Sequence, residues 1–321
     1  MFIFFLLFIL LEPIHWDVRE PVKNFHGRQG VINDIEEKLN QSSTVVISAM
    51  GGCGKTQTAA KFVKTHKDEY DNIFWIAASN LQKSLAMIAR RILDSNDNGE
   101  IVCQGNLSVL ELVQKINRLT IGTNVLYIVD NVFEGDLKNL DTLVRNCTLQ
   151  NTRILITSQL SQFSNDKVVL IRLPNFTDVE SKTFLQKNLA EASEEEISKL
   201  SAELGQFPLC LQQAVSYIRN HDNIDISLFV SNFQKSRKSI LDPKRALSEY
   251  DKTLLTVWDF AFEKLNKSKK ALKILTMMCR MDNSCIKRET FLYAKNIVED
   301  EIELNDIVDT LSEYSLSLIH I

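Results

Sequence analysis

The sequence predicts an α/β fold in which helices cover both faces of a parallel β-sheet and a helical region follows the sheet. Three observations support this expectation. Helical and strand patterns alternate from Phe25 onward, and a cluster of glycines at residues 51–54 lies between a strand pattern and a helix pattern. After Pro174 the strand-type runs stop until near the end of the chain, and helical periodicity takes over. Such alternation is typical of parallel strands joined by right-handed crossovers.

Composition places the chain among globular proteins. Its 321 residues are 45% hydrophobic and 24% charged, which excludes a collagen, a coiled-coil rod and a disordered tail and predicts about two or three domains. Lys and Arg total 37 against 41 Asp and Glu, so a net charge of −4 provides no basic field, and we expect no nucleic-acid partner. The six cysteines lack zinc-site spacing and are typical of a reducing compartment, so we expect a cytoplasmic protein.

The chain begins with an apolar run, MFIFFLLFILL, at residues 1–11. As a helix this run would be about 16 Å long, shorter than the roughly 30 Å hydrocarbon core of a bilayer. No Lys or Arg precedes the run, and no small-x-small cleavage site follows it. Residues 1–20 are therefore expected to be an apolar leader, either a signal or membrane anchor or an incidental segment, and the pattern favours the incidental one.

The region before Pro174 alternates between helix and strand patterns. Its first helix is indicated by VINDIEEKL, in which Val31, Ile32, Ile35 and Leu39 repeat at helical spacing. Further helices are expected at residues 55–66, 85–93 and 109–119. Strands, which are rich in β-branched residues, are expected at residues 44–49, 73–77, 124–130, 153–157 and 167–171.

After Pro174 we expect mainly helices, at residues 178–189, 194–204, 208–220 and 226–236. A stripe of apolar side chains then repeats at helical spacing and consists of Leu254, Val257, Trp258, Ala261, Phe262 and Leu265. We interpret the aromatic residues of this stripe as core packing rather than a cofactor site. Shorter helical units are expected at residues 272–279, 305–311 and 314–319.

The most informative segment is Ala49-Met50-Gly51-Gly52-Cys53-Gly54-Lys55-Thr56, between a predicted strand and a predicted helix. Small residues let the backbone wrap closely, so that successive N–H groups and the positive end of the helix dipole point at phosphate oxygens. Lys55 is expected to reach the β- and γ-phosphates, and the Thr56 hydroxyl to bind Mg²⁺. The candidate nucleotide-binding residues of this loop are Gly51, Gly52, Cys53, Gly54, Lys55, Thr56 and Gln57.

One residue of the segment departs from the phosphate-loop pattern GxxxxGK[ST]. The pattern has glycine at its first position, where this chain has Ala49. Alanine adopts most backbone conformations except those with positive φ. We therefore expect the loop to form with a slightly altered entry, and the change puts the affinity for nucleotide in question.

A carboxylate follows the apolar strand at residues 126–129. Asp130 would lie at the carboxyl end of a buried parallel strand, beside the phosphates, so it is the candidate catalytic residue and, with Thr56, the candidate Mg²⁺ ligand. Its neighbour Asn131 carries an amide, which cannot act as a general base toward water. We therefore expect at most a slow ATPase.

The motifs, in their order along the chain, resemble the NB-ARC domain, the nucleotide switch of many signalling proteins of the STAND class of P-loop NTPases. The resemblance covers roughly residues 20–321 and is carried by the segments Phe25-His26-Gly27-Arg28, 51–56, 73–76, 126–130, 153–158 and Gly205-Gln206-Phe207-Pro208-Leu209. It implies ADP or ATP as ligand, together with Mg²⁺. It also implies a P-loop NTPase sheet in which the sensor strand lies between the phosphate-loop strand and the strand of Asp130.

The resemblance assigns roles to four residues outside the loop. Pro208 matches a proline that packs against the adenine, and Gln159 stands at a sensor position that is usually Arg. Arg28 belongs to a turn near the base of the nucleotide, where an exposed structural role is an equally open interpretation. His320 is either the late histidine that contacts the β-phosphate or a coincidence.

The resemblance also divides the chain into domains. We expect the apolar leader at residues 1–20, a nucleotide-binding domain at 21–173 and a helical subdomain at 174–240. Residues 241–321 are expected to form an incomplete winged-helix-like subdomain, in a chain that ends before the C-terminal repeats usual in the family.

Two functions are open at this point. The first is an ADP/ATP-binding molecular switch in signalling, closed with ADP, opened by nucleotide exchange, and acting on protein partners or by self-oligomerisation through the nucleotide domain. The second is a degenerate scaffold that acts by protein–protein contact, in which Ala49, Asn131 and Gln159 have eroded the nucleotide chemistry. The intact Lys55 and Thr56 favour nucleotide binding.

Overall fold

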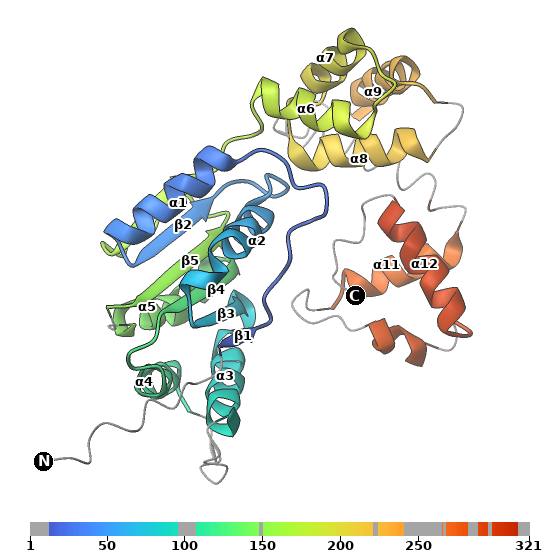
Figure 1. Ribbon diagram of the computed structural model, residues 1–321. Coiled ribbons are helices and arrows are strands. Elements are labelled where there is room, and N and C mark those ends of the chain that lie inside the picture. Colours follow the sequence, from blue (N-terminus) through green and yellow to red (C-terminus); the bar gives the residue numbers. More distant parts are fainter. Residues whose placement is uncertain are drawn as a thin grey trace, which may run out of the picture. The chain divides into compact units, whose positions relative to one another are not determined.

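The computed structural model describes residues 13–95, 107–147, 150–220, 224–240, 265, 268–281, 288–294 and 297–313. The chain divides into two compact units, Met1–Pro174 and Asn175–Ile321. The predicted parallel sheet lies in the first unit and the predicted helical region in the second (Figure 1).

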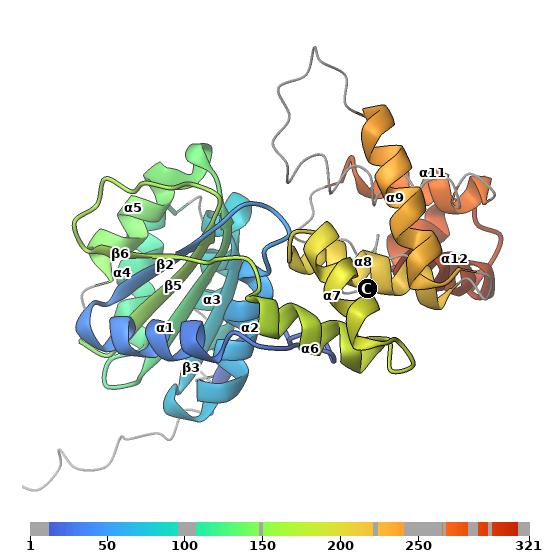
Figure 2. The same cartoon turned by 90° about the horizontal axis from the view of Figure 1, so that it is seen from above.

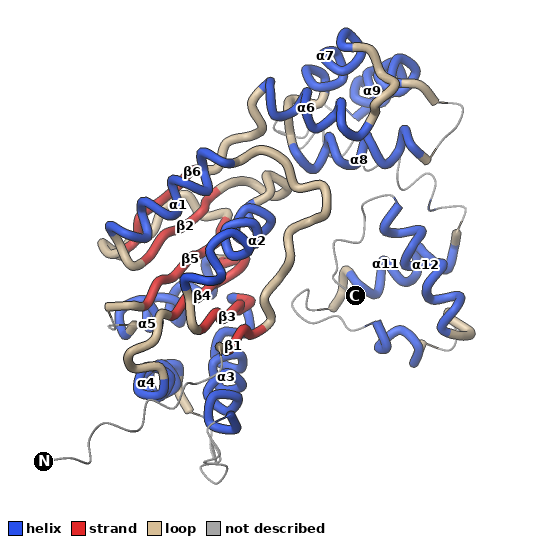
Figure 3. Tube along the Cα trace, viewed as in Figure 1, coloured by secondary structure: helices blue, strands red, loops and turns tan. Residues whose placement is uncertain are grey.

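The first unit contains a β-sheet of parallel strands. Its order, among the described residues, is β1-β3-β4-β5-β2-β6. The strands are β1 (Ile14–Trp16), β2 (Thr44–Ser48), β3 (Asn72–Ala77), β4 (Val125–Val132), β5 (Thr152–Ser158) and β6 (Val168–Arg172). Figure 3 shows them side by side in red. The predicted position of the sensor strand is confirmed, because β5 pairs with β2 on one side and with β4 on the other.

Helices cover both faces of the sheet, as predicted. The helices of this unit are α1 (Gln29–Gln41), α2 (Lys55–His66), α3 (Leu81–Ser95), α4 (Val109–Leu119) and α5 (Leu137–Asn146). Successive strand residues point to opposite faces, so Val46 packs with α3, α4 and α5, and Val45 packs with α1 and α2. Figure 2 shows α1 and α5 on opposite sides of the strands. Burial on both faces explains why the strands are almost continuously apolar.

One strand, β1, and one helix, α5, were not predicted. Ile14–Trp16 were expected to lie in the leader, but these residues form β1 and pair in parallel with β3, with Trp16 opposite Phe74. A segment of three residues is too short to show the alternation that identifies a strand. Its pairing depends on the exposed edge of β3, which the local sequence does not reveal.

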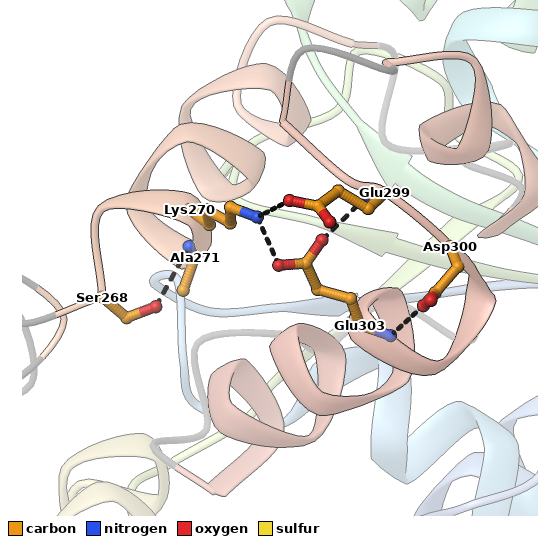
Figure 4. Close-up of polar contacts among 6 residues, drawn as sticks. All are labelled: Ser268, Lys270, Ala271, Glu299, Asp300 and Glu303. Atoms are coloured by element: carbon orange, nitrogen blue, oxygen red, sulfur yellow. Dashed lines mark hydrogen bonds and ion pairs between the residues drawn. The ribbon is translucent and has the colours of Figure 1, made fainter.

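The second unit contains helices with two apolar clusters. The first cluster is formed by α6 (Asp178–Asn188), α7 (Glu194–Glu203), α8 (Pro208–Arg219) and α9 (Ile226–Ile240). The second is formed by α11 (Lys269–Met278), a 3₁₀ turn at Arg288–Tyr293 and α12 (Glu301–Glu313), together with the buried Leu265. Lys270 of α11 forms ion pairs with Glu303 of α12 and with Glu299, which precedes that helix (Figure 4). No helix in the described part of the chain is both long and apolar enough to cross a membrane.

Several predicted features lie outside the described residues. They are the apolar run at residues 1–11, the helical unit at 314–319, His320 and every residue of the apolar stripe before Leu265, from Leu254 to Phe262. The winged-helix-like character of residues 241–321 stays a prediction.

Candidate functional site

The loop between β2 and α2 has the backbone that its glycines were expected to provide. Gly52 and Gly54 have φ values of 78° and 90°, a region that residues with a Cβ rarely adopt, and Gly54 caps the first turn of α2. Ala49 is not among the described residues with positive φ. The alanine at the first position of the pattern therefore does not strain the loop.

Lys55 is the first residue of α2, and its side chain donates hydrogen bonds to the beginning of the loop. Its Nζ donates to the carbonyl oxygens of Ala49, at 2.8 Å, and of Met50, at 2.9 Å. The residue is 8% exposed. Burial lowers the pKa of the Lys55 ammonium, because it disfavours the charged form, although the nearby Cys53 and Asp130 act in the opposite direction.

The two predicted Mg²⁺ ligands lie in contact. The hydroxyl of Thr56 donates to Asp130 Oδ1 over 2.9 Å, and the hydroxyl of Thr157 donates to the same oxygen over 2.6 Å. Asp130 is 5% exposed. A hydroxyl and a carboxylate are the hard oxygen ligands that Mg²⁺ prefers, so these residues fit the ion that the fold implies.

Asp130 sits at an irregularity in β4 rather than at its last residue. The register between β4 and β5 shifts between Val129 and Val132, and Asn131 between them has a φ of 63°. The Asn131 N–H donates to Thr157 Oγ1 over 2.8 Å. This bulge turns the strand locally and holds the carboxylate of Asp130 beside both threonine hydroxyls.

The residues after β5 lie beside the start of the loop. The Ala49 N–H donates to the Ser158 carbonyl oxygen over 3.2 Å, and Ser48 Oγ donates to the Leu160 carbonyl oxygen over 2.6 Å. A Cβ added to Gly51 would lie 3.9 Å from Gln159 Nε2. The structure thus brings the predicted sensor residue Gln159 to the phosphate loop, and its side chain is exposed there.

Arg28 is buried, so the alternative of an exposed structural arginine is wrong. The residue is 4% exposed and caps α1 with a φ of 67°. Its guanidinium donates to the carbonyl oxygen of Pro174 over 2.6 Å and to that of Cys53 over 3.2 Å. Arg28 therefore ties the phosphate loop to the end of the segment that follows β6.

A segment that was not predicted to belong to the site contacts two of its residues. We call residues 17–24, which follow β1, the strap; from β1 the chain runs beside α2 and then returns to α1 (Figure 1). Arg19 Nη1 lies 3.1 Å from Asp130 Oδ2, and the Val22 N–H donates to Gln57 Oε1 over 2.8 Å. Arg19 lacked a signal in the sequence, because it is a single charged residue in the expected leader.

Pro208 belongs to the second unit, where it begins α8. A proline is favoured there because the first helical N–H has no partner within the helix. The turn before it needs Gly205, which has a φ of 63° and would place a Cβ 2.9 Å from the Phe207 ring. The contact of Pro208 with an adenine stays a prediction.

The sequence is similar to a family model and to a known protein. The family model described as the NB-ARC domain matches residues 28–195, just over half of the chain. Over 134 residues, 39% of this chain, the sequence is 28% identical to an Arabidopsis thaliana protein named "Probable disease resistance protein At5g66910".

Two solved structures also resemble the chain. A STAND protein with a tetratricopeptide repeat sensor from Pyrococcus horikoshii aligns with 93% of this chain at a TM-score of 0.53 and 17% identity. A Walker-type ATPase of Pyrococcus abyssi aligns with 93% of the chain at a TM-score of 0.49 and 14% identity. The chain spans 16% of the length of the plant protein and 52% of the STAND structure.

Proposed function

The chain belongs to the NB-ARC domain family of STAND P-loop NTPases, and from this premise we propose that it is a molecular switch, closed with ADP and opened when ATP replaces ADP. The observation that carries the proposal is the phosphate loop. Its left-handed glycines and Lys55 lie next to the contact between Thr56 and Asp130. The loop thus combines backbone donors, a cation and hard oxygen ligands within one small site.

Each residue has a defined part in holding the nucleotide. The N–H groups of the loop and of the first turn of α2 would receive the phosphate oxygens, and Lys55 would exchange its two carbonyl partners for them. Thr56 and Asp130 would hold Mg²⁺, which neutralises phosphate charge when bound. By family resemblance, Pro208 and Arg28 would lie at the adenine and Gln159 near the terminal phosphate.

Hydrolysis would be slow at best. The side chain of Asn131, which follows Asp130, carries an amide that cannot take a proton from water. The backbone N–H of Asn131 donates to the Thr157 hydroxyl oxygen. A switch tolerates this deficiency because turnover only resets it. The working step is the differential binding of ATP and ADP, and moving from 1% to 99% open would need about a 10⁴-fold preference.

We further propose the domain roles that the family suggests. Residues 21–173 would bind nucleotide, 174–240 would form the helical subdomain and 241–321 the winged-helix-like subdomain. The chain would act in the cytoplasm on protein partners, or by self-oligomerisation through the nucleotide domain. The relatives are longer than this chain, so these roles concern only the part of the relatives that the chain covers, and no trigger or effector is proposed.

Retained nucleotide is the decisive measurement. The full chain is purified without added nucleotide and denatured, and the supernatant is analysed by ion-exchange chromatography. We expect about one ADP per chain, lost in Lys55→Ala and kept in Lys61→Ala, a matched lysine-to-alanine change further along the same helix. Circular dichroism checks that each variant is folded.

The alternative function gives a different result. A chain that is folded, empty, and not stabilised by added ADP or ATP in thermal unfolding would overturn the switch, because any ligand of the native state must raise its stability. The degenerate scaffold would then be the better account.

A further inference from the structure

The carboxylate of Asp130 already has a cationic partner from outside the phosphate loop. Its Oδ1 accepts hydrogen bonds from the hydroxyls of Thr56 and Thr157. Its Oδ2 pairs with Arg19 Nη1 at 3.1 Å. Thr56 and Arg19 therefore bind different oxygens of the Asp130 carboxylate.

Arg19 is held in place by more than this ion pair. Its guanidinium carbon lies 5.5 Å from the centre of the Trp75 ring, a cation–π distance. Trp75 is 1% exposed and lies in β3, the strand next to Asp130. The strap around Arg19 is also fixed to α2, by the Glu20–Lys64 ion pair at 2.7 Å and the bond from the Val22 N–H to Gln57.

The pair lies where charge is poorly screened. The side chains of Arg19 and Asp130 are 25% and 6% exposed. Two cations that approach one partly buried carboxylate repel each other more strongly than they would in water. A divalent ion brought to Asp130 must therefore either displace Arg19 or be weakened by it.

We propose that Arg19 is an internal cation that competes with Mg²⁺ for the Asp130 carboxylate and so sets the Mg²⁺ concentration at which the chain takes up Mg²⁺–nucleotide. This inference rests on the proposed function, because it concerns the same site. When Mg²⁺ binds, Arg19 leaves Asp130 and the strap loosens from α2. Arg19 is a positioning residue that acts through Asp130. The contact between the strap and α2 therefore depends on whether Mg²⁺ is bound.

The first test is an Mg²⁺ titration of nucleotide binding by the full chain. Binding of a fluorescent ATP analogue is followed at fixed nucleotide concentration while Mg²⁺ is raised from zero in a chelating buffer. The affinity of Mg²⁺ for the nucleotide itself is the same for every variant and cancels in the comparison. We expect Arg19→Gln to lower the half-saturating Mg²⁺ concentration by about tenfold, as removal of a competing, partly buried ion pair predicts.

Three further variants separate charge from structure. Arg19→Lys keeps the positive charge and should remain within about threefold of the wild type. Lys64→Gln loosens the strap but leaves Arg19 in place, so its shift should be smaller than that of Arg19→Gln. Arg145→Gln removes the exposed pair with Asp141 and should leave the titration unchanged.

The second test is hydrogen exchange in the strap. In the wild type, Mg²⁺ with ATP should speed exchange at residues 17–24, including the Val22 amide, whereas ATP with chelator should not. In Arg19→Gln the exchange should be fast under both conditions. A merely structural arginine predicts no effect of Mg²⁺ on these amides.

The outcomes separate this inference from the proposed function. Equal Mg²⁺ dependence in wild type and Arg19→Gln, with nucleotide bound by both, overturns the competition and leaves the switch intact. Absence of nucleotide binding at every Mg²⁺ concentration, in wild type and variants alike, defeats the proposed function, and the competition falls with it. If Arg19→Gln does not fold, unchanged strap exchange in the wild type with Mg²⁺ and ATP still refutes the inference.

Discussion

At the scale of a single residue, Arg28 stabilises the phosphate loop by hydrogen bonds to the backbone. It was expected at the base of the nucleotide, yet its guanidinium is buried and bound to the carbonyl oxygens of Pro174 and Cys53. The bond to Cys53 is buried and the bond to Pro174 is partly buried, and a carbonyl oxygen that loses such a donor costs free energy. The residue therefore contributes to stability whether or not it also contacts a ligand.

We expect Arg28→Ala to lower the free energy of unfolding of the first unit by about 3 kcal/mol, because two carbonyl oxygens lose a charged donor. Alanine is as restricted as arginine at the φ of 67°, so the change isolates the side-chain bonds. Urea unfolding followed by tryptophan fluorescence measures it, since two of the three tryptophans, Trp16 and Trp75, lie in this unit. Arg145→Ala, at an exposed pair, is the control, and equal effects of the two variants would contradict the prediction.

At the scale of an element, α7 begins with a reciprocal cap. Ser193 Oγ accepts from the Glu196 N–H at 3.3 Å, and Glu196 Oε2 accepts from the Ser193 N–H at 2.9 Å and from its hydroxyl at 2.7 Å. These bonds lower the pKa of Glu196 below its ordinary 4.5. The same box begins α4 at Ser108 and α6 at Thr177, so the helix starts are set by local sequence.

The cap predicts a pH dependence of stability. A folded-state pKa that is depressed means that the stabilisation is complete above about pH 4.5 and is lost as pH falls through the folded value. We expect Glu196→Gln to lower the urea midpoint near neutral pH and to match the wild type at lower pH, where the native carboxyl is protonated. Glu195→Gln removes a charge from the same turn but keeps the bonds to Ser193, and should leave this pH dependence in place. A difference between Glu196→Gln and wild type that persists in acid would refute the interpretation.

At the scale of the whole molecule, the chain has separate cores. The sheet of the first unit is packed on both faces, and the helices of the second unit enclose their own clusters. A unit with its own core can unfold on its own. Stability is therefore not one number for this protein.

We expect calorimetry of nucleotide-free protein to show more than one transition. Leu155→Ala in β5 and Leu200→Ala in α7 each empty a fully buried position and should cost about 2–5 kcal/mol. Each should lower the transition of its own unit and leave the other unchanged. A single transition that both variants lower equally would show that the units unfold together.

The sequence by itself determined the parts that depend on neighbouring residues. The glycines of the loop, Lys55 at the start of α2 and the apolar strand before Asp130 are local patterns, and the structure confirms them. It also confirms the order of the predicted helices and strands, to which it adds β1 and α5. These features need only period, turn chemistry and short spacing. The position of the sensor strand was implied by family resemblance, and the sheet confirms it.

Only the tertiary structure decided the contacts between residues far apart in the chain. Arg19 meets Asp130 across 111 positions, and Arg28 meets Pro174 across 146. β1 exists because the edge of β3 is available to three residues that carry no strand signal of their own. Such pairings depend on the sheet that brings the partners together, so they become visible only once the fold is known.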